Sequence, residues 1–492
     1  MAIAFHLQLL AALAAVASGL LARDPQTSAF SAQAEHPWPT ARGPLLRQFG
    51  NSDVIVPNDL SASLAWSWHH PEGQYHTVVC GGPLIDASGM FYLTTNDGIR
   101  KFSPTGQVLW HYPQKDHMLN NQPALLGSTV YGSNQNGEAF AVDQKTGATV
   151  WRKQLARSAG GDCGYPAAYD GVFTVGAESG THPGHEGGNN RVFGLDAASG
   201  SNLWEFRPQL PVWNFAPLFP GDDTCVFMDF GGGMYRLGLH NGTLLWYVPS
   251  AGALKSFSDG GATLGPNGAV YSCSNAGSAG GTEGTKGLLR ALRLADGALL
   301  WQQVLPQPCN SYPAVGTLGE GQGLSVAVTP GSFMGMPNLH GSIMAFDATT
   351  GALHWGYNTQ PYTGFMFMAK GDIEGALDRH TYNKGHDICL PAHWSSANIA
   401  GDGTVFAARS DGYVYAVHGP AAPVAAESLA NLRADFKSTP STVANLRADF
   451  ESTPGTVARL WNAHGAALHG AFAFAPGTMA VSTCDTLYVF KF

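Results

Sequence analysis

A short phrase that ends in tryptophan recurs along this chain and constrains its fold more than any other feature. Eight of the twelve tryptophans end such a phrase, and six of these follow the pattern Gly-x-x-x-Trp. The six complete copies end at Trp110, Trp151, Trp204, Trp246, Trp301 and Trp355, and two copies without the glycine end at Trp66 and Trp461. From Trp66 to Trp355 the copies lie 41 to 55 residues apart. A repeat of this length indicates a propeller or a solenoid, whose units bury their faces only against one another.

The repeated unit is most legible over residues 121–151. Four short β-type runs (PALLG, TVYGS, EAFAVD and ATVW) are separated by Gly-Ser, Asn-Gly and Thr-Gly pairs, which are turn formers of tight hairpins. No long helical periodicity lies between the repeats, which argues against a helical solenoid and a parallel βαβ sheet. Four antiparallel strands in about 42 residues are typical of one propeller blade.

The unit resembles the PQQ-type (pyrroloquinoline quinone) repeat, and the resemblance covers about residues 62–492, with a further clear copy at Val405–Val417. The resemblance implies that the glycine and tryptophan of neighbouring blades dock together and lock the ring. It does not imply one activity, because the family includes both enzymes and non-enzymatic scaffolds.

The two ends of the repeat region predict how the ring closes. SASLAW at Trp66 looks like a fourth strand without its first three, and the segment that ends at Phe492 looks like three strands without a fourth. If both ends share a blade, no sheet edge is left exposed. We therefore predict an all-β, eight-bladed propeller over residues 59–492; seven blades is the alternative, if the Trp461 segment is not a true fourth strand.

The N-terminal residues read as a targeting segment followed by a linker. Residues 7–22 are almost wholly apolar, and Ala15-Val16-Ala17 offers a cleavage site, although no basic residue precedes Arg23. Sixteen residues are short for a membrane span. We expect residues 1–22 to be a signal peptide and residues 23–58 a linker. The mature chain would then be secreted or lumenal, without a stable membrane span.

Composition narrows the class of partner. Charged residues make up 12%, the net charge is −9, and no Lys/Arg stripe occurs, which argues against nucleic-acid binding. Seven scattered cysteines contain no metal-type spacing, so we expect one or two disulfides of undetermined connectivity. We also expect the propeller to be monomeric.

Propeller topology assigns the long connections to the two faces of the ring. Connections between second and third strands and between blades open on one face, called here the top face. Four long ones belong there, at residues 178–191, 274–287, 330–341 and 356–394. The top face is therefore the expected site for a protein partner or a small polar ligand, although glycine-rich insertions are also simply tolerated on surfaces.

On the opposite, bottom face we expect an insertion at residues 420–458. Within it, residues 431–444 recur almost unchanged as 445–458. The duplication would form either a partner-binding arm or a poorly ordered insertion.

Alignment of the first strands predicts a ring of residues at the top mouth of the channel. Three positions before the aligned Pro or Ala, the chain has Cys80, Asn120, Cys163, Asn214, Asp259, Asn310, Trp394 and Leu468. Asn120, Asn214, Asp259 and Asn310 are candidate binding residues for a polar ligand or calcium, which prefers oxygen donors; alternatively they cap turns. Tyr165 and Tyr312, close by in sequence, would supply aromatic walls or merely core.

Histidines suggest a second candidate. His182 and His185 lie in one predicted top-face connection, and imidazole is a common transition-metal ligand. A second group, His380, His386 and His393, lies in the longest connection. Neither spacing is that of a rigid metal-binding pair, so solvated loop histidines are the alternative.

Two functions remain. The first is an exported binding scaffold that uses its top face, similar to the scaffold members of the family that bind proteins in the bacterial outer membrane, although no lipobox cysteine follows the leader. The second is a quinoprotein-like oxidoreductase of alcohols or sugars, for which the resemblance implies PQQ and calcium. Many such enzymes carry an adjacent Cys-Cys pair, and this chain has none, which favours the scaffold.

Overall fold

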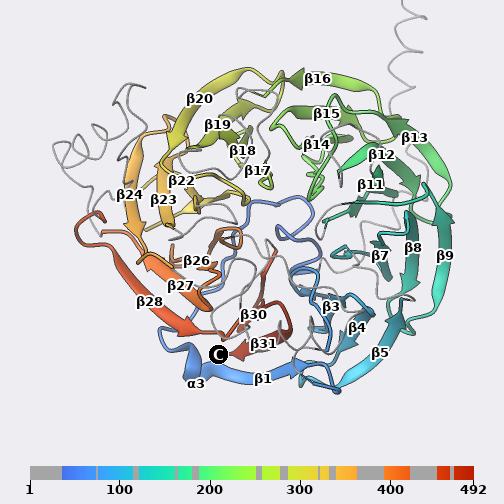
Figure 1. The fold of residues 1–492 in the computed structure, drawn as a ribbon, viewed down its shortest axis with the longest axis horizontal. Coiled ribbons are helices and arrows are strands. Elements are labelled where there is room, and N and C mark those ends of the chain that lie inside the picture. The colour runs from blue at the N-terminus through green and yellow to red at the C-terminus, as the bar shows by residue number, and fades with distance from the viewer. Residues whose placement is uncertain are drawn as a thin grey trace, which may run out of the picture. The chain divides into compact units, whose positions relative to one another are not determined.

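A computed structural model describes this chain over residues 36–73, 76–114, 121–160, 164–179, 188–250, 258–276, 286–319, 322–331, 340–362, 393–420, 452–465 and 470–492. His36–Phe492 form one compact unit, whose strands are arranged as a ring of small sheets (Figure 1). The signal peptide proposed at residues 1–22 lies outside the described residues. Among the described residues, no helix has the length and apolar character to span a bilayer.

The ring contains eight antiparallel sheets, as the sequence predicts; seven have four strands and one has three. Blade one is β2 (Leu84–Ile85), β3 (Phe91–Thr95), β4 (Gly98–Phe102) and β5 (Val108–Pro113), and blade two is β6 (Ala124–Leu126), β7 (Thr129–Ser133), β8 (Glu138–Asp143) and β9 (Thr149–Gln154). Blade three is β10 (Ala167–Tyr169), β11 (Val172–Ser179), β12 (Asn189–Asp196) and β13 (Asn202–Phe206), and blade four is β14 (Thr224–Met228), β15 (Met234–Gly238) and β16 (Leu244–Val248). Blade five is β17 (Ala262–Leu264), β18 (Ala269–Ala276), β19 (Lys286–Arg293) and β20 (Leu299–Leu305), and blade six is β21 (Ala314–Thr317), β22 (Leu324–Val328), β23 (Ser342–Asp347) and β24 (Leu353–Asn358). Blade seven is β25 (Asn398–Ile399), β26 (Val405–Ala408), β27 (Tyr413–His418) and β28 (Val457–Asn462).

Both ends of the repeat region build the eighth blade. β29 (Phe472–Ala475), β30 (Thr478–Ser482) and β31 (Thr486–Lys491) supply its inner three strands. β1 (Leu64–His69), which follows the one-turn helix α3 (Leu60–Ser63), pairs antiparallel with β31 and opposes Trp66 to Val489. The predicted closure is confirmed, and the Trp461 segment is a true fourth strand, β28. The seven-blade alternative is therefore wrong.

The recurring tryptophan joins each blade to the next. In six blades the indole Nε1–H donates to a main-chain oxygen of the following blade, at 2.7–3.2 Å. The same indole covers the glycine of that blade's phrase so closely that a β-carbon would lie 2.6–3.1 Å from it; these glycines are Gly106, Gly147, Gly200, Gly242, Gly297 and Gly351. All six have a positive φ, which favours glycine. The docking implied by the resemblance is confirmed.

This docking changes at blade seven, whose phrase has lost its glycine. The indole of Trp355 packs instead against Gly419, where an added β-carbon would lie 2.2 Å from Nε1. Among the described residues Nε1 of Trp355 has no acceptor. Trp461 then packs edge-on against Tyr488 and Phe490 of the shared blade, with ring centroids 4.9 and 5.0 Å apart. At the junction between blades seven and eight, aromatic packing therefore replaces the glycine contact.

Blade four lacks a regular inner strand. The segment before β14 contains Pro220, which has no N–H to donate to a ladder. A single bridge between Leu218 and Val226 remains in place of the inner strand.

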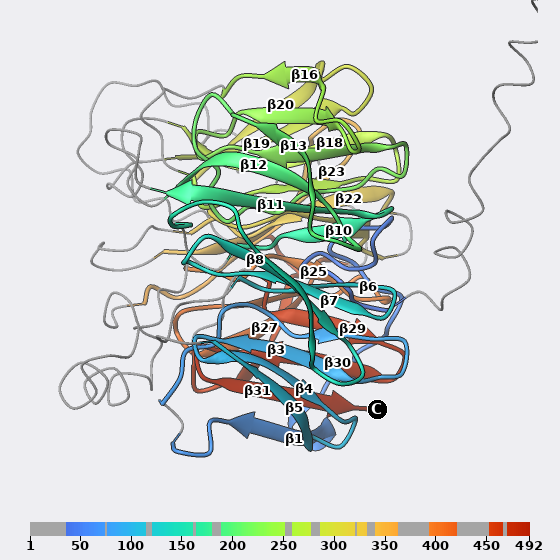
Figure 2. The same ribbon diagram turned by 90° about the vertical axis from the view of Figure 1, so that its right-hand side faces the viewer.

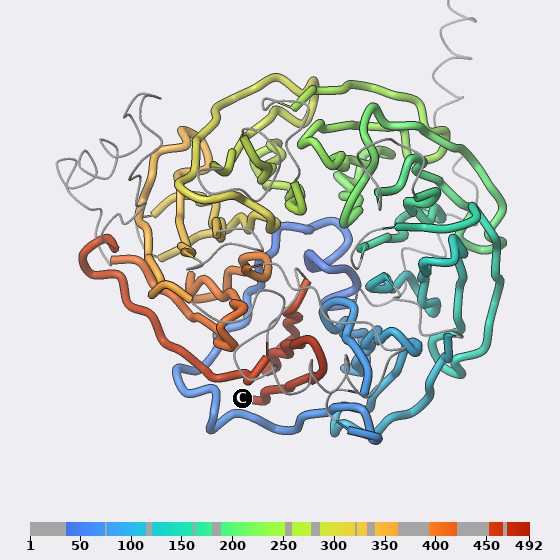
Figure 3. Tube along the Cα trace, in the orientation of Figure 1, coloured from blue at the N-terminus to red at the C-terminus, as the bar shows by residue number. Residues whose placement is uncertain are grey.

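Residues 36–58, expected to be part of a linker, pack against the inner strands of the ring, which corrects that expectation for the residues described. The segment crosses the middle of the ring (Figures 1 and 3). Its main chain pairs with inner strands far apart in sequence: Trp38 exchanges two hydrogen bonds with Ile85 of β2, and Phe49 O accepts from Val315 N of β21 at 2.7 Å. The Gln48 amide binds both Pro217 O (3.1 Å) and Phe219 N (2.8 Å) of blade four. The segment lacks a strand period because its contacts pass from one blade to another along its length.

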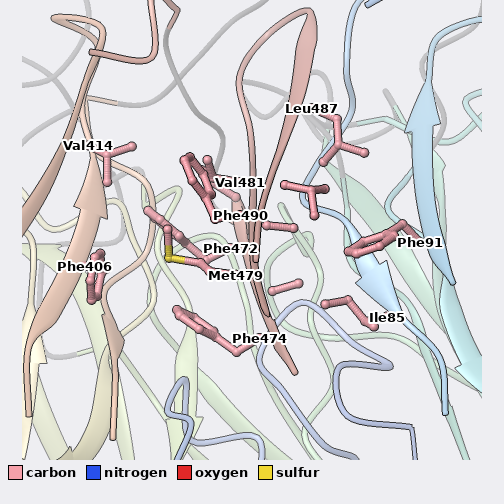
Figure 4. Packing of buried hydrophobic residues seen from close by; sticks show 14 of the residues in the cluster. Ile85, Phe91, Phe406, Val414, Phe472, Phe474, Met479, Val481, Leu487 and Phe490 are labelled. Carbon is pink, nitrogen blue, oxygen red and sulfur yellow. The ribbon is translucent and has the colours of Figure 1, made fainter. Parts of the chain in front are cut away.

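A large apolar cluster spans the closing junction. Phe406 and Val414 of blade seven, Phe472 and Phe490 of blade eight, and Phe91 of blade one belong to it (Figure 4). Trp38 of the N-terminal segment joins the same cluster and contacts Phe474 edge-on at 5.2 Å. The shared blade is thus held by packing as well as by the β1–β31 ladder.

Candidate functional site

The structure brings together three of the four polar residues predicted at the channel mouth. Asn214, Asp259 and Asn310 come from the starts of blades four, five and six and are buried. The amide of Asn214 donates to Asp259 O at 3.4 Å, and Asp259 N donates to the side-chain oxygen of Asn310 at 3.1 Å. Asn120 lies outside the described residues. The clustering is observed, whereas a role in ligand binding stays a prediction.

Asn310 already has a structural task. Its side-chain oxygen accepts a second hydrogen bond, from the amide of Asn275 at 2.8 Å, and the Asn275 oxygen accepts from Cys309 N at 2.8 Å. These bonds join blade five to the start of blade six, which is a different role from the expected capping of a local turn. The turn-capping interpretation stays a prediction.

The two predicted tyrosines lie together below this ring. Tyr165 and Tyr312 are buried, and their rings meet edge-on with centroids 5.8 Å apart. The hydroxyl of Tyr312 donates to Asn214 O, and burial raises the pKa of that hydroxyl well above its usual range. With Ala41 they form a small apolar cluster, so they act as core below the mouth.

Sequence reasoning missed Arg42, which comes from the segment read as a linker. Its guanidinium is 1% exposed, donates to Pro313 O (2.5 Å) and Ala397 O (3.1 Å), and lies 5.8 Å from the centre of the Tyr312 ring. Its Nε and Nη1 have no partner among the described residues. Burial lowers its pKa to about 10, against the opposing effects of Tyr312 and Tyr165, so the group stays charged at neutral pH. No motif around Arg42 signals this position.

The described residues of the mouth do not fit a calcium ion. Calcium needs six to eight oxygen ligands, whereas the three predicted residues described at the mouth, Asn214, Asp259 and Asn310, carry four side-chain oxygens between them. The Asn310 oxygen already accepts two hydrogen bonds. The charged guanidinium of Arg42 contacts the Tyr312 ring beneath them, and a fixed positive charge disfavours a cation nearby. We therefore derive no quinoprotein reaction step from this site.

A disulfide stabilises the same edge of the mouth. Cys273 in β18 is bonded to Cys309, which precedes Asn310, and Cys484 is disulfide-bonded as well. Cys225 keeps a buried thiol, whose pKa is raised to about 12 by burial. Structural disulfides are typical of proteins in oxidising compartments.

The long connections leave the strands as predicted. Residues 180–187, 277–285 and 332–339 join second to third strands of blades three, five and six, and residues 363–392 join blade six to seven. The eight-residue strands β11 and β12 make one of the longest hairpins of the ring (Figure 2). The interiors of these connections, with His182, His185, His380 and His386, lie outside the described residues. His393 is buried and accepts from Arg409 Nε at 2.9 Å.

Comparison with known proteins agrees with this architecture. The family model described as outer membrane protein assembly factor BamB, PQQ_2, matches residues 32–180, 95–258 and 135–418. A BamB of Moranella endobia (strain PCIT) is 22% identical over 282 residues, which are 54% of this chain and 65% of the relative. The match thus spans less than two thirds of that relative.

Solved structures share the fold. BamB from Moraxella catarrhalis superposes with a TM-score of 0.54 at 15% identity, covering 87% of this chain and 99% of that chain. The quinohemoprotein alcohol dehydrogenase from Comamonas testosteroni superposes with a TM-score of 0.55 at 13% identity, covering 96% and 82%. At such identities the similarity concerns the fold alone, and it is equal for a protein named as an assembly factor and for an enzyme.

Proposed function

This chain belongs to the PQQ-repeat β-propeller family, and from this premise we propose that it is an extracytoplasmic scaffold that binds a protein partner on its top face. The observation that carries the proposal is that the long connections lie on one face of the ring. The long connections after β11, β18, β22 and β24 all leave at the top face. Residues 38–54 fill the centre by pairing with inner strands, so the exterior of the top face remains as the surface for recognition.

Two further observations support this proposal. The Cys273–Cys309 disulfide favours an oxidising compartment. The polar groups of the mouth are engaged in joining blades, as the two bonds to Asn310 show, which favours a rigid platform over a cofactor site. A small polar ligand at the mouth remains the second kind of partner.

Photo-crosslinking tests which face is used. A photoreactive amino acid is placed at Glu178 or Lys286, at the top ends of β11 and β19, and at the exposed bottom-face positions Thr146 and Asp296 as matched controls. In cells that produce the chain, the top positions should give one discrete adduct. The adduct protein, purified, should then bind the wild-type chain in solution. Adducts from the bottom positions alone, or equal adducts from both faces, would contradict the proposal.

The quinoprotein alternative has its own experiment. The mature chain is titrated with PQQ and calcium while quinone absorbance and dye-coupled turnover on alcohols and sugars are followed. We expect neither saturable binding nor turnover, because the described side chains predicted at the mouth carry fewer oxygen atoms than calcium takes. Saturable binding with turnover would replace the scaffold proposal by the enzyme.

A further inference from the structure

Three side chains with metal-ligating atoms meet on the top face, at the junction between blades eight and one. His70, Glu72 and His76 lie in the connection that leaves β1, and one ligating atom of each lies within 4.8 Å of the others. The imidazoles of His70 and His76 stack, with centroids 4.4 Å apart, and His76 Nε2 is 3.1 Å from the Glu72 carboxylate. The connection therefore brings two imidazoles and one carboxylate together. Because the two rings are nearly parallel, one of them has to turn for both nitrogen lone pairs to face a single ion.

The hydrogen bonding of His70 fixes which nitrogen carries its lone pair. The Glu72 main-chain N–H donates to His70 Nδ1 at 3.2 Å. Since an N–H can only donate, Nδ1 is the unprotonated nitrogen of the neutral ring. The ring proton is then on Nε2, which lies 3.6 Å from the Asp97 carboxylate. A lone pair on one nitrogen and a carboxylate facing the other is the arrangement of metal-ligating histidines in proteins.

Asp97 is itself held in place. It lies in the turn between β3 and β4, where Arg100 donates to both of its oxygens at 2.8 and 2.6 Å and Thr95 donates to one at 2.6 Å. Arg100 in turn lies over the Trp68 ring of β1 at 5.1 Å. The carboxylate that would orient His70 is thus fixed by both blades of the junction.

We propose that His70 Nδ1, the Glu72 carboxylate and His76 Nε2 bind a divalent transition-metal ion of the zinc type on the top face. Zinc takes two histidines and one glutamate with bonds of about 2.0–2.2 Å, which places tetrahedral ligand atoms about 3.4 Å apart. His76 and Glu72 already satisfy this spacing at 3.1 Å. The Glu72 side chain is 69% exposed and can move, and the ion replaces the Glu72 N–H at His70.

Another group of possible ligands, Asp170, Asp223 and His240, lies at bottom-face turns. It offers a single imidazole, and Asp223 and His240 are exposed. Since imidazole is the preferred ligand of these ions, the group at the blade-eight junction is the stronger site. The two groups lie on opposite faces and share no residue, so variants separate them.

The test measures zinc affinity of the untagged full-length chain by competition with a chromophoric chelator. One ion per chain is expected. Glu72→Gln and His76→Ala should each weaken zinc binding by about tenfold to a hundredfold or more. Loss of a residue that only orients a metal ligand already weakens binding by that factor. His69→Ala is the matched control, because His69 is exposed beside His70, and it should leave affinity unchanged.

A spectroscopic measurement checks the ligands directly. Cobalt-loaded protein should give the visible absorption of a tetrahedral site, and zinc X-ray absorption should show two imidazoles. Both signals should vanish in His76→Ala. No binding in competition with the chelator would overturn the proposal, as would full affinity in both Glu72→Gln and His76→Ala. Loss of binding in His240→Ala, or in the His182→Ala/His185→Ala double variant, with Glu72→Gln unaffected would assign the ion elsewhere and overturn it too.

Discussion

The indole of Trp301 in blade five lies flat against Gly351 of blade six. A β-carbon at Gly351 would approach the indole Cδ2 to 2.7 Å, and the indole N–H donates to Ala348 O at 2.9 Å in the same turn. The glycine thus provides both the space for the ring and the left-handed backbone, with φ of +70°. Five other junctions repeat this contact. Docking between blades therefore needs glycine, which leaves room for the indole because it has no side chain.

We predict that Gly351→Ala lowers stability for two separable reasons. A left-handed conformation costs an alanine about 1 to 2 kcal/mol, and overpacking against Trp301 adds about 1 to 3 kcal/mol. Gly268→Ala is the matched control, because its φ is +72° but an added β-carbon meets nothing within 4 Å. Thermal unfolding should therefore show the larger drop for Gly351→Ala. Equal drops would mean that the indole contact contributes nothing.

The ring was predictable because its signals are local and repeated. Turn pairs such as Asn136–Gly137 and the outer-strand tryptophans recur along the blades. This repetition also showed that the eighth blade is shared between the strand at Trp66 and the strands that end near Phe492. The polar positions Asn214, Asp259 and Asn310 were found for the same reason, since aligned repeats place equivalent residues at equivalent heights.

Other parts could not be predicted, because their order comes from unique tertiary contacts. Residues 36–58 follow no period, since Trp38, Gln48 and Phe49 each bind a different blade. The approach of Asp97 to His70 depends on how β1 joins the ring, and the spacing of the residues in the sequence does not reveal this. Trp38 was the one hint in the sequence that this segment is buried, because tryptophan is a largely buried residue type and the residues around it are rich in Pro and Ser.

Trp38→Ala tests whether the N-terminal segment is part of the core. The side chain is 1% exposed and packs on Phe474, so truncation should cost about 3 to 5 kcal/mol. Leu46 lies in the same segment but is 46% exposed, and Leu46→Ala should change stability by about 0.5 kcal/mol or less. Denaturant unfolding of both variants gives the comparison. A linker would tolerate both substitutions alike.

Removal of the Cys273–Cys309 bond should destabilise the channel mouth. The bond closes a segment with a sequence separation of 36, for which the chain-entropy model gives about 3 to 4 kcal/mol. The double variant Cys273→Ala/Cys309→Ala should therefore unfold at a lower temperature than wild type.

The wild-type protein under reducing conditions is the companion measurement. It should melt no higher than the double variant, because reduction also opens the disulfide of Cys484, whereas non-reducing peptide mapping of untreated protein should recover the linked Cys273 and Cys309 peptides. Native Cys225 should resist alkylation throughout, because its thiol is buried and its pKa is raised to about 12. A melting temperature unchanged by both treatments would show that this bond does not support the mouth.

Asp229 should make stability fall as pH rises through mildly acidic values. Burial raises the pKa of this carboxyl to about 6, although hydrogen bonds from Tyr235, Gly233 and Gly231 and the charge of Arg290 oppose the shift. The folded-state pKa is above the ordinary value of 3.8, so the folded chain binds the extra proton between about pH 4 and pH 6. The contribution is fully present below the unfolded pKa and is lost as pH rises through the folded pKa.

Asp229→Asn isolates the contribution of this carboxyl, because the amide cannot titrate. Its oxygen can still accept the hydrogen bonds from Gly231 N and Gly233 N, which are 2.9 and 2.8 Å long in the native chain. The unfolding free energy of the variant minus that of wild type should increase between pH 4 and pH 7 by up to about 3 kcal/mol, since each pKa unit is worth about 1.4 kcal/mol. Stability curves at half-unit pH steps measure the difference directly, and titrations elsewhere cancel in it. A difference that stays flat, or one that decreases toward pH 7, would place the carboxyl in its ordinary range despite its burial.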